Sequence, residues 1–273
     1  MKFPRLALLV SLLPALAPAA PFLAIRNGET FSYRVGWGIL GRAGELVIAA
    51  KEEPGPAGTT LLRVTTDIAS RGLVRGFYAY DNRGEVVIDR HSGRLTLTRE
   101  KGSDGRRGTD TETVFDYDRG VAVYTDRVHP DRNAAVPLPP GDPIDLISAL
   151  IGTRDWTLQP GEKKDVLVNF GNEFYPLAIY AEEFEEVTTP LGTYRTLRLV
   201  PRMEKNPRGV FKRGGEIKVW ISQGAAKLPV KMQLKLKIGA ATLLLAGYQN
   251  PAPTAPAPAT PAPASAPGTP GSL

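Results

Sequence analysis

Few side chains in this 273-residue sequence have the types and spacing that catalysis or metal binding requires. Cysteine is absent, so disulfides, thiol catalysis and thiolate metal ligands are excluded. The two histidines, His91 and His129, each stand beside turn residues, and neither has a second histidine at a metal-binding spacing. Because a zinc site needs three or four suitable ligands, two isolated loop histidines indicate surface residues. We predict no metal site and no cofactor.

Carboxylates supply one enzymatic alternative. Two acidic groups on either side of a cleft can hydrolyse a glycosidic bond. The run Ala181–Val187 carries four glutamates, and Asp142 and Asp145 stand at the start of an expected helix. In a strand, however, alternate glutamates point to opposite faces, and aspartates at the start of a helix are explained by capping. A carbohydrate-active enzyme is therefore the less favoured alternative, and no catalytic residue is assigned.

Serine and phosphate chemistry also lack their usual motifs. No G-x-S-x-G or S-x-x-K sequence is present, so acyl transfer by a serine has no local support. The glycines between Gly36 and Gly44 follow a strand pattern, but no helix pattern follows them. A phosphate-binding loop is therefore not predicted. The sequence favours a protein that is not an enzyme.

The strongest secondary-structure pattern lies near the C-terminal end of the chain. From Val230 to Ile238, apolar residues alternate with lysine and glutamine, and Ile217, Val219 and Ile221 show the same period upstream. Successive side chains of a strand point to opposite faces, so both runs predict strands with one buried face. The segment SQGAAKLP between them contains the Gly and Pro of a chain reversal. We predict an antiparallel hairpin here.

Lysines on the other face of this hairpin allow two interpretations. Lys218, Lys231, Lys235 and Lys237 could meet anionic lipid headgroups or an anionic wall polymer. Lysine is also the ordinary solvent-side residue of a sheet and protects edges from association, which is the favoured interpretation. The formal charge of +6 is spread along the chain without a dense cluster, so no nucleic-acid partner is predicted.

The rest of the chain also predicts short strands, ten to twelve in all, with no repeat of 20–50 residues. Residues 78–89 resemble a hairpin bent at Asn82-Arg83-Gly84, and residues 72–77 a turn or short helix. One amphipathic helix is predicted at about 142–152, with Asp142 as N-cap and Pro143 at the first helical position. The predicted fold is mainly β: a single large curved antiparallel sheet, either a half-barrel or a β-sandwich, with this helix covering it.

The N-terminal residues 1–19 have the pattern of a secretory signal. Lys2 and Arg5 precede the apolar run Leu6–Leu16, and Ala17-Pro18-Ala19 offers a small-x-small cleavage site. We expect export across the inner membrane to the periplasm or cell envelope. Retention of this segment as an anchor is the alternative.

Three further segments complete the predicted organisation. Residues 20–27 form a short lead, 28–248 the β domain, and 249–273 a disordered tail rich in proline and alanine, with too few apolar residues to form a core. We expect a monomer without disulfides.

Large apolar residues at strand spacing suggest either a packed core or the lining of a cavity in the concave face. The candidates for a ligand-lining role are Trp37, Phe77, Tyr80, Phe174, Trp220, Met232, Leu234 and Leu236.

Four segments resemble a known family of exported bacterial proteins. They are ETFSYRVGWGILGRAGELVI, PLPPGDPIDLISAL, TPLGTYRTLRL and GVFKRGGEIKVWISQGAAKLPVKMQLKLKIG, within residues 28–248. The chain is identified through them as a member of the domain-of-unknown-function 3108 family. That family carries no established activity, so no functional residue can be transferred. Its fold is similar in kind to the curved-sheet carriers of lipoproteins and lipids, the LolA/LolB type.

Together these observations predict a non-enzymatic cell-envelope protein. A lipid or a lipoprotein acyl chain, bound in the concavity of the sheet, is the expected partner. An envelope assembly or protein-interaction module is the first alternative, with an envelope protein as partner.

Overall fold

Antiparallel strands make up most of this computed structural model, which describes residues 24–105, 107–212, 214–236 and 239–250. The described strands form one fourteen-stranded sheet in the order β8-β7-β6-β5-β4-β3-β2-β1-β14-β13-β12-β11-β10-β9. The predicted large antiparallel sheet is confirmed, with more strands than the ten to twelve expected. The predicted leader 1–19 and the predicted tail from residue 251 onward lie outside the described residues.

The strands are β1 (Thr30–Trp37), β2 (Leu40–Pro54), β3 (Thr60–Ser70), β4 (Tyr80–Asp89), β5 (Leu95–Asp104), β6 (Arg107–Asp116), β7 (Val121–Asp126), β8 (Ala134–Pro137), β9 (Lys163–Phe170), β10 (Glu173–Thr189), β11 (Gly192–Arg202), β12 (Glu216–Ser222), β13 (Pro229–Leu236) and β14 (Gly239–Gln249). The α-helices are α1 (Gly72–Phe77) and α2 (Leu146–Gly152), and a 3-10 turn, η3 (Thr153–Asp155), continues α2.

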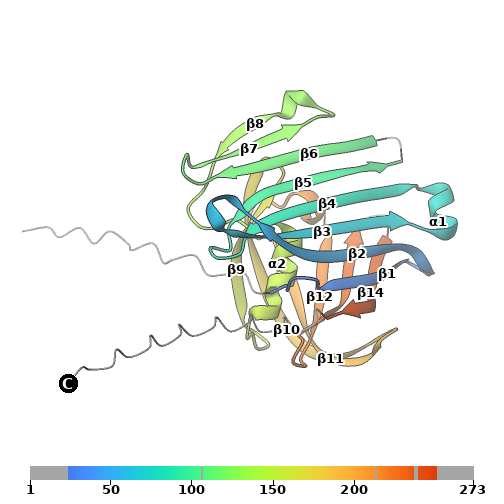
Figure 1. Cartoon of the computed structure of the whole chain (residues 1–273). Helices are drawn as coiled ribbons and strands as arrows, with labels where there is room; N and C mark the ends of the chain where they lie inside the picture. Colours follow the sequence, from blue (N-terminus) through green and yellow to red (C-terminus); the bar gives the residue numbers. More distant parts are fainter. Residues whose placement is uncertain (1–23, 106, 213, 237–238, 251–273) are drawn as a thin grey trace, which may run out of the picture.

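The sheet curls back on itself without closing into a barrel, so that β2 to β7 face β9 to β12 (Figure 1). Its edges are β8 and β9, and the segment that links β8 to α2 crosses between them. Ile144 in that segment forms a parallel bridge with Val168: its N–H donates to Leu167 at 2.9 Å, and its carbonyl accepts from Asn169 at 2.8 Å. This bridge and α2 cover the gap at one end of the half-barrel.

The concave face carries the apolar core. Register places Phe31 between Ile48 of β2 and Tyr248 of β14, and Leu245 beside Tyr33. Phe31, Ile48 and Leu245 are fully buried. Each residue buried in this row contributes about 1.5–3 kcal/mol by leaving water, which is how a chain without disulfides holds a sheet of this size.

The helix α2 begins three residues later than the sequence predicts. Asp145, not Asp142, is the N-cap: one carboxylate oxygen accepts from the N–H groups of Ile147 at 2.9 Å and Ser148 at 3.1 Å. The reason is the bridge between Ile144 and Val168, which keeps the preceding residues extended. Asp142 instead accepts from Arg94 at 2.8 Å. The prediction of Asp142 as cap was therefore wrong, although the covering helix exists.

The predicted hairpin within residues 78–89 is also wrong. Asn82, Arg83 and Gly84 lie inside the single strand β4, paired to β3 on one side and β5 on the other. A Cβ on Gly84 would lie 2.4 Å from Oγ1 of Thr66. The glycine therefore serves close packing between strands and not a turn. The predicted short helix at 72–77 is confirmed as α1.

The hairpin predicted near the C-terminal end is confirmed as β12 and β13, which pair antiparallel, and β13 also pairs antiparallel with β14. Met232 and Leu234 share the concave face with Val219 and Ile217. Lys231 lies on the opposite face, with its ammonium 4.1 Å from the centre of the Trp220 ring. Among the described residues, no helix is long and apolar enough to cross a membrane.

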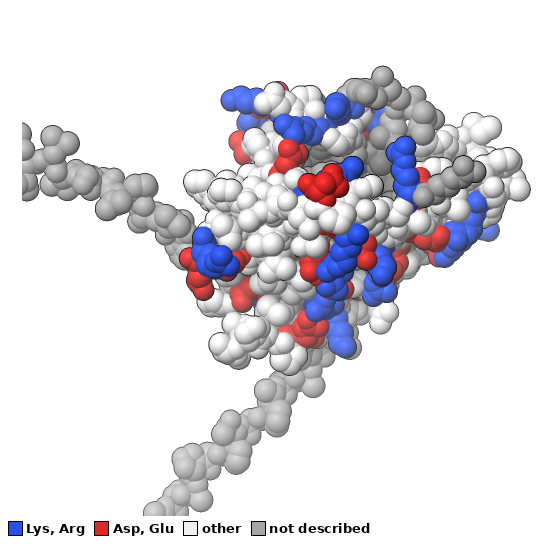
Figure 2. Space-filling model, turned by 90° about the horizontal axis from the view of Figure 1, so that it is seen from above, with Lys and Arg blue, Asp and Glu red and all other residues white. Residues whose placement is uncertain are grey.

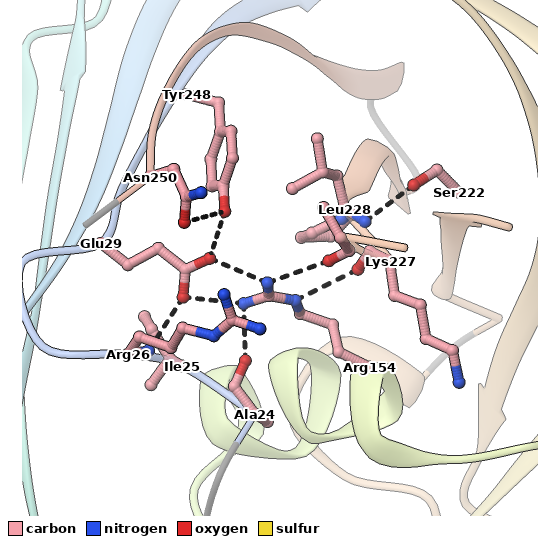
Figure 3. Close-up of polar contacts among 12 residues, drawn as sticks. Ala24, Ile25, Arg26, Glu29, Arg154, Ser222, Lys227, Leu228, Tyr248 and Asn250 are labelled. Carbon is pink, nitrogen blue, oxygen red and sulfur yellow. Dashed lines mark hydrogen bonds and ion pairs between the residues drawn. The ribbon is translucent and has the colours of Figure 1, made fainter. Parts of the chain in front are cut away.

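A buried ion pair closes the α2 end of the half-barrel. Arg154 of η3 donates to the two carboxylate oxygens of Glu29 at 2.8 and 3.0 Å (Figure 3), and the Glu29 side chain has no exposed surface. The remaining N–H groups of Arg154 donate to the carbonyls of Ala24, Ala226 and Lys227 at 2.5–3.1 Å. All five guanidinium donors are thereby used. The residues before β1, the end of α2 and the β12–β13 turn are joined through one side chain.

Two other donors converge with Arg154 on the Glu29 carboxylate. The Tyr248 hydroxyl donates to it at 2.7 Å, and the N–H of Arg26 at 2.9 Å. Burial alone would raise the pKa of Glu29, but the hydrogen bonds from Arg154, Tyr248 and Arg26 outweigh it and hold the pKa below its ordinary value. Tyr248 also contacts Asn250, so both ends of the described chain lie at the α2 end (Figure 3).

Arg154→Met should lower the free energy of unfolding by about 3–5 kcal/mol, because it leaves Glu29 as an unpaired buried charge. Urea unfolding measures this change. The control is Arg127→Met, which removes an exposed arginine paired with Asp110 and Glu112 and should cost less than about 1 kcal/mol. Equal costs for the two substitutions would contradict the role given to Arg154.

The lowered pKa of Glu29 gives this contribution a pH dependence. The stabilisation is fully present above the ordinary pKa of glutamate and is lost as the pH falls through the lower folded-state value. Glu29→Gln should be less stable at neutral pH and should lack this acid-dependent loss.

Burial raises the pKa of Asp145, so this group has the opposite pH dependence. A carboxyl that binds its proton more tightly in the folded state destabilises the fold as the pH rises from the unfolded pKa towards the folded one. Asp145→Asn keeps a capping oxygen and should remove that loss, so its free energy of unfolding at neutral pH should equal or exceed that of the native chain. Asp145→Ala should be about 1 kcal/mol less stable than Asp145→Asn at every pH, because it lacks the capping oxygen. Equal stabilities of the Asn and Ala variants in thermal unfolding would disprove the capping role.

Candidate functional site

An apolar pocket opens on the concave face at the end of the sheet opposite α2. Its volume is about 560 Å³. It lies between β1, β2, β3 and β4 on one side and β13 and β14 on the other, with α1 at its margin. Its lining residues are Val35, Trp37, Ala43, Gly44, Ile68, Ala69, Ser70, Val74, Tyr78, Tyr80, Leu234 and Ala241. Carbon atoms dominate this surface, so the pocket suits an apolar group.

Arginines hold α1 at the margin of the pocket. Arg71 pairs with Glu45 of β2 at 2.5 Å, and Arg75 forms a two-pronged pair with Asp81 at 2.8 and 2.9 Å. Both arginines also donate to the carbonyl of Ser70. The Ser70 hydroxyl in turn accepts from the N–H of Tyr80 at 2.9 Å. A helix of six residues has little stability of its own, so these contacts fix its position.

Helical spacing decides which side chains of α1 reach the pocket. Val74 and Tyr78 are four residues apart and share the face that lines it. Leu73 and Phe77, also four apart, share another face and are exposed, Phe77 to 92%. Phe77, predicted from the sequence as a lining residue, is therefore absent from the pocket.

A second, polar hollow adjoins the apolar pocket. Its volume is about 1330 Å³, and it opens between the β5–β7 part of the concave face and the β9–β10 turn. Charged groups of both signs line it: Glu100, Asp104, Asp126, Asp131 and Glu173 with Arg107 and Arg132. The imidazole of His129 lines it as well. The two hollows meet where Tyr80 of β4 pairs with Asp104 of β5, because Tyr80 lines the first and Asp104 the second.

Two tyrosines, Tyr78 and Tyr80, lie where the apolar pocket meets the polar hollow. The rings of Tyr78 and Tyr80 stack with their centres 6.3 Å apart. The pKa of the Tyr78 hydroxyl is raised to about 12, mainly by its hydrogen bond to Asp104 and secondly by burial. The phenol therefore stays protonated at physiological pH and remains a hydrogen-bond donor.

The predicted lining residues divide among several places. Trp37, Tyr80 and Leu234 lie together in the apolar pocket. Met232 is buried in the core, where register places it between Val219 and Leu243.

Two aromatic candidates lie outside the pocket, and one aliphatic candidate is not described. Phe174 packs edge-on against Phe115 with ring centres 6.5 Å apart. Trp220 lies on the convex face, because it pairs in register with Lys231 and Arg198, and its indole N–H donates to Glu185 at 2.5 Å. The side chain of Leu236 lies outside the described residues.

Several pocket residues were not singled out from the sequence. Val35, Ile68 and Ala241 occupy strand positions whose alternation predicts burial. Only the register of β1 with β2 and β14 shows that they surround the same space.

The glutamates of Ala181–Val187 do not form a catalytic pair. Arg198 donates to Glu182, Glu183 and Glu185 at 2.6–3.1 Å. A bulge in β10 between Ala181 and Phe184 brings these neighbouring carboxylates to one face, where simple alternation predicts two faces. They surround an arginine on the convex side, away from both hollows.

Asp126 is the most buried carboxylate of the polar hollow, with 3% of its surface exposed. Burial would raise its pKa, but the backbone N–H groups of His129 and Val128, at 2.8 and 3.0 Å, outweigh this and lower it. Such a group stays ionised and is a poor general acid. Within the described residues, no three histidine or acidic side chains converge to hold a metal ion.

The convex side of β5 to β7 carries alternating charges. Arg99 pairs with Glu112, and Arg127 pairs with both Glu112 and Asp110 at 3.1 Å. Figure 2, which views the molecule from the β8 side, shows Lys and Arg mixed with Asp and Glu over this surface. No single-sign patch stands out there.

Solved structures with related folds have very different sequences. A beta-barrel-like protein of the domain of unknown function DUF1849 from Brucella abortus is 7% identical, with a TM-score of 0.51, and the alignment covers 85% of this chain and 98% of that one. A presumptive lipoprotein from Parabacteroides distasonis and a presumptive exported protein with a YmcC-like fold from Bacteroides fragilis are 11% and 12% identical. Their TM-scores are 0.32 and 0.33, and the alignments cover 85% of this chain and 99% and 100% of theirs.

These similarities show a shared β-barrel-like fold with the Brucella protein and nothing about activity. No curated protein matches the chain significantly. The family model of a protein of unknown function, DUF3108, matches residues 32–246, which include the curled sheet, both hollows and α2. The chain therefore belongs to the DUF3108 family.

Proposed function

We propose that this protein binds an amphipathic lipid, with an acyl chain in the apolar pocket at the α1 end of the sheet. The observation that carries the proposal is the pocket itself: about 560 Å³, lined almost entirely by apolar atoms and open to the surface. Its volume falls in the range of roughly 300–1,000 Å³ typical of small-molecule sites. Transfer of an acyl chain into it gains about 0.8 kcal/mol for each buried CH₂ group.

The adjoining polar hollow supports an amphipathic ligand over a purely apolar one. A chain bound between Trp37 and Leu234 would bring its polar end towards Tyr80 and Asp104, where the second hollow begins. Arg107, Arg132 and His129 could donate hydrogen bonds there, and the carboxylates could accept them. Because both signs of charge are present, the hollow does not select the charge of a headgroup.

Two titratable groups of the described residues that line the hollows favour binding over catalysis. Asp126, the most buried candidate acid, has a lowered pKa, and Tyr78 keeps its proton. The proposed location is the cell envelope, supported by the secretory pattern of residues 1–19.

Filling the pocket should abolish binding. Ala241 lines the pocket beside Trp37 and Leu234, and Ala241→Phe would place a ring in the space of the acyl chain. We expect the affinity for a fluorescent fatty acid in vesicle-free solution to fall at least about tenfold, the effect of losing a few buried CH₂ groups. Fluorescence titration measures the dissociation constant.

Ala135→Phe provides the matched control, since Ala135 is exposed on the edge strand β8. It should leave the affinity unchanged, and thermal unfolding should show that both variants fold. Failure of the native protein to take up the fatty acid, together with no lipid in organic extracts of the purified protein, would refute the proposal. So would equal binding by Ala241→Phe.

A further inference from the structure

Large apolar side chains project into solvent at the end of the molecule where the apolar pocket opens. Ile39 is fully exposed, Phe77 is 92% exposed and Leu73 is 78% exposed. Leu40 is 42% exposed. Isolated exposed apolar residues are ordinary, but several gathered at one end indicate a contact surface. We call Ile39, Leu40, Leu73 and Phe77 the apolar rim.

The rim comes from two separate segments that flank the pocket. Ile39 lies in the β1–β2 turn and Leu40 begins β2. Leu73 and Phe77 of α1 each precede a residue that lines the pocket, Val74 or Tyr78. Figure 1 shows the β1–β2 turn and α1 side by side at the right-hand end of the sheet. The N–H of Arg71 donates to the carbonyl of Ala43 at 2.8 Å, which joins the two segments directly.

The charges beside the rim favour an anionic partner. Two acidic residues near the rim, Glu45 of β2 and Asp81 of β4, are each paired with an arginine, Arg71 or Arg75. Arg42, exposed near the start of β2, has no ion-pair partner among the described residues. Figure 2 shows blue arginine or lysine atoms, with some red acidic atoms beside them, next to white atoms at the right-hand end. The rim is therefore apolar at its tips and has one cation without an ion pair among the described residues, Arg42, near its base.

We propose that the apolar rim docks onto the surface of a lipid bilayer containing anionic lipids, with Ile39, Leu73 and Phe77 inserted among the acyl chains. Side chains at the tips of a turn and a short helix can enter the boundary between headgroups and hydrocarbon, while Arg42 at the base meets an anionic headgroup. The tips project nearly completely from the body, so no preformed surface surrounds them that a protein partner could match in shape.

The inference deepens the proposed function, because docking would place the mouth of the pocket against the bilayer from which an acyl chain is taken. It rests on the proposed function only for the step in which an acyl chain passes from the bilayer into the pocket. Docking itself needs no ligand in the pocket, so the two can fail separately.

The absence of cysteine makes a site-resolved test direct. Phe77→Cys introduces a single thiol that can be labelled with the environment-sensitive fluorophore NBD. Leu191→Cys is the matched control, since Leu191 is 43% exposed in the turn between β10 and β11. That turn lies at the α2 end of the molecule. Thr196, near the start of β11, pairs with Ser222 at the end of β12. The Ser222 hydroxyl accepts from the N–H of Leu228, and the carbonyl of the preceding residue, Lys227, accepts from Arg154.

Vesicles of phosphatidylcholine with phosphatidylglycerol are then added to each labelled protein. The emission at position 77 should shift to shorter wavelength, and that at position 191 should not. Vesicles of phosphatidylcholine alone should bind about fivefold more weakly, because they offer Arg42 no lipid with a net negative charge. Leu73→Asp should weaken vesicle binding about tenfold or more and leave fatty-acid binding in vesicle-free solution unchanged.

Three results would overturn the proposal. They are no shift at position 77 with either kind of vesicle, an equal shift at both labelled positions, and a shift at position 77 produced only by an envelope protein. The last result would assign the rim to a protein partner. Loss of fatty-acid uptake alone would refute the proposed function and leave the docking result standing.

Discussion

The buried pairing of Glu29 with Arg154 is the interaction on which the shape of this molecule depends. Removing a carboxylate and a guanidinium from water costs several kcal/mol for each ion, so neither can be buried without nearly complete compensation. Here all five donors of Arg154 are used, on Glu29 and on three carbonyls from two other segments. Because these segments precede β1 and join β12 to β13, the pairing holds the start of the sheet against its second half. The guanidinium also lies 5.2 Å from the centre of the Phe31 ring, which ties the polar cluster to the apolar core.

The Glu29–Arg154 pair closes the α2 end of the half-barrel, and the apolar pocket opens at the other end. Along β1, Phe31 lies near the ion pair, while Trp37 lies in the apolar pocket six residues, or roughly 20 Å, away. At the open end, β13 and β14 contribute apolar side chains and β5 to β7 contribute charged ones, so one opening has an apolar and a polar half. The exposed side chains of the rim surround the apolar half. An amphipathic ligand and a bilayer surface are thus suggested by one asymmetry of the sheet.

Period-two alternation was a reliable guide wherever one face of a strand is buried, as in β1, β12 and β13. It failed where tertiary contacts changed a local preference. Asp142 and Pro143 have the types that begin a helix, but the bridge between Ile144 and Val168 keeps them extended. Gly84 has the type that makes a turn, but Thr66 needs the space that a side chain would occupy. The glutamates near Phe184 share a face because a bulge adds residues to β10.

By itself, the sequence determined that the protein is a one-sided antiparallel sheet with a helix, that no cysteine chemistry is available, and that the chain has the pattern of an exported protein. These properties depend on residue type and on spacing along the chain. The tertiary structure decided which apolar residues surround open space and which fill the core. Trp220, Phe77 and Leu234 have similar apolar character, yet one faces Lys231 on the convex side, one projects into solvent and one lines the pocket. Strand register and the curl of the sheet separate them, because both depend on pairings between residues far apart in the sequence.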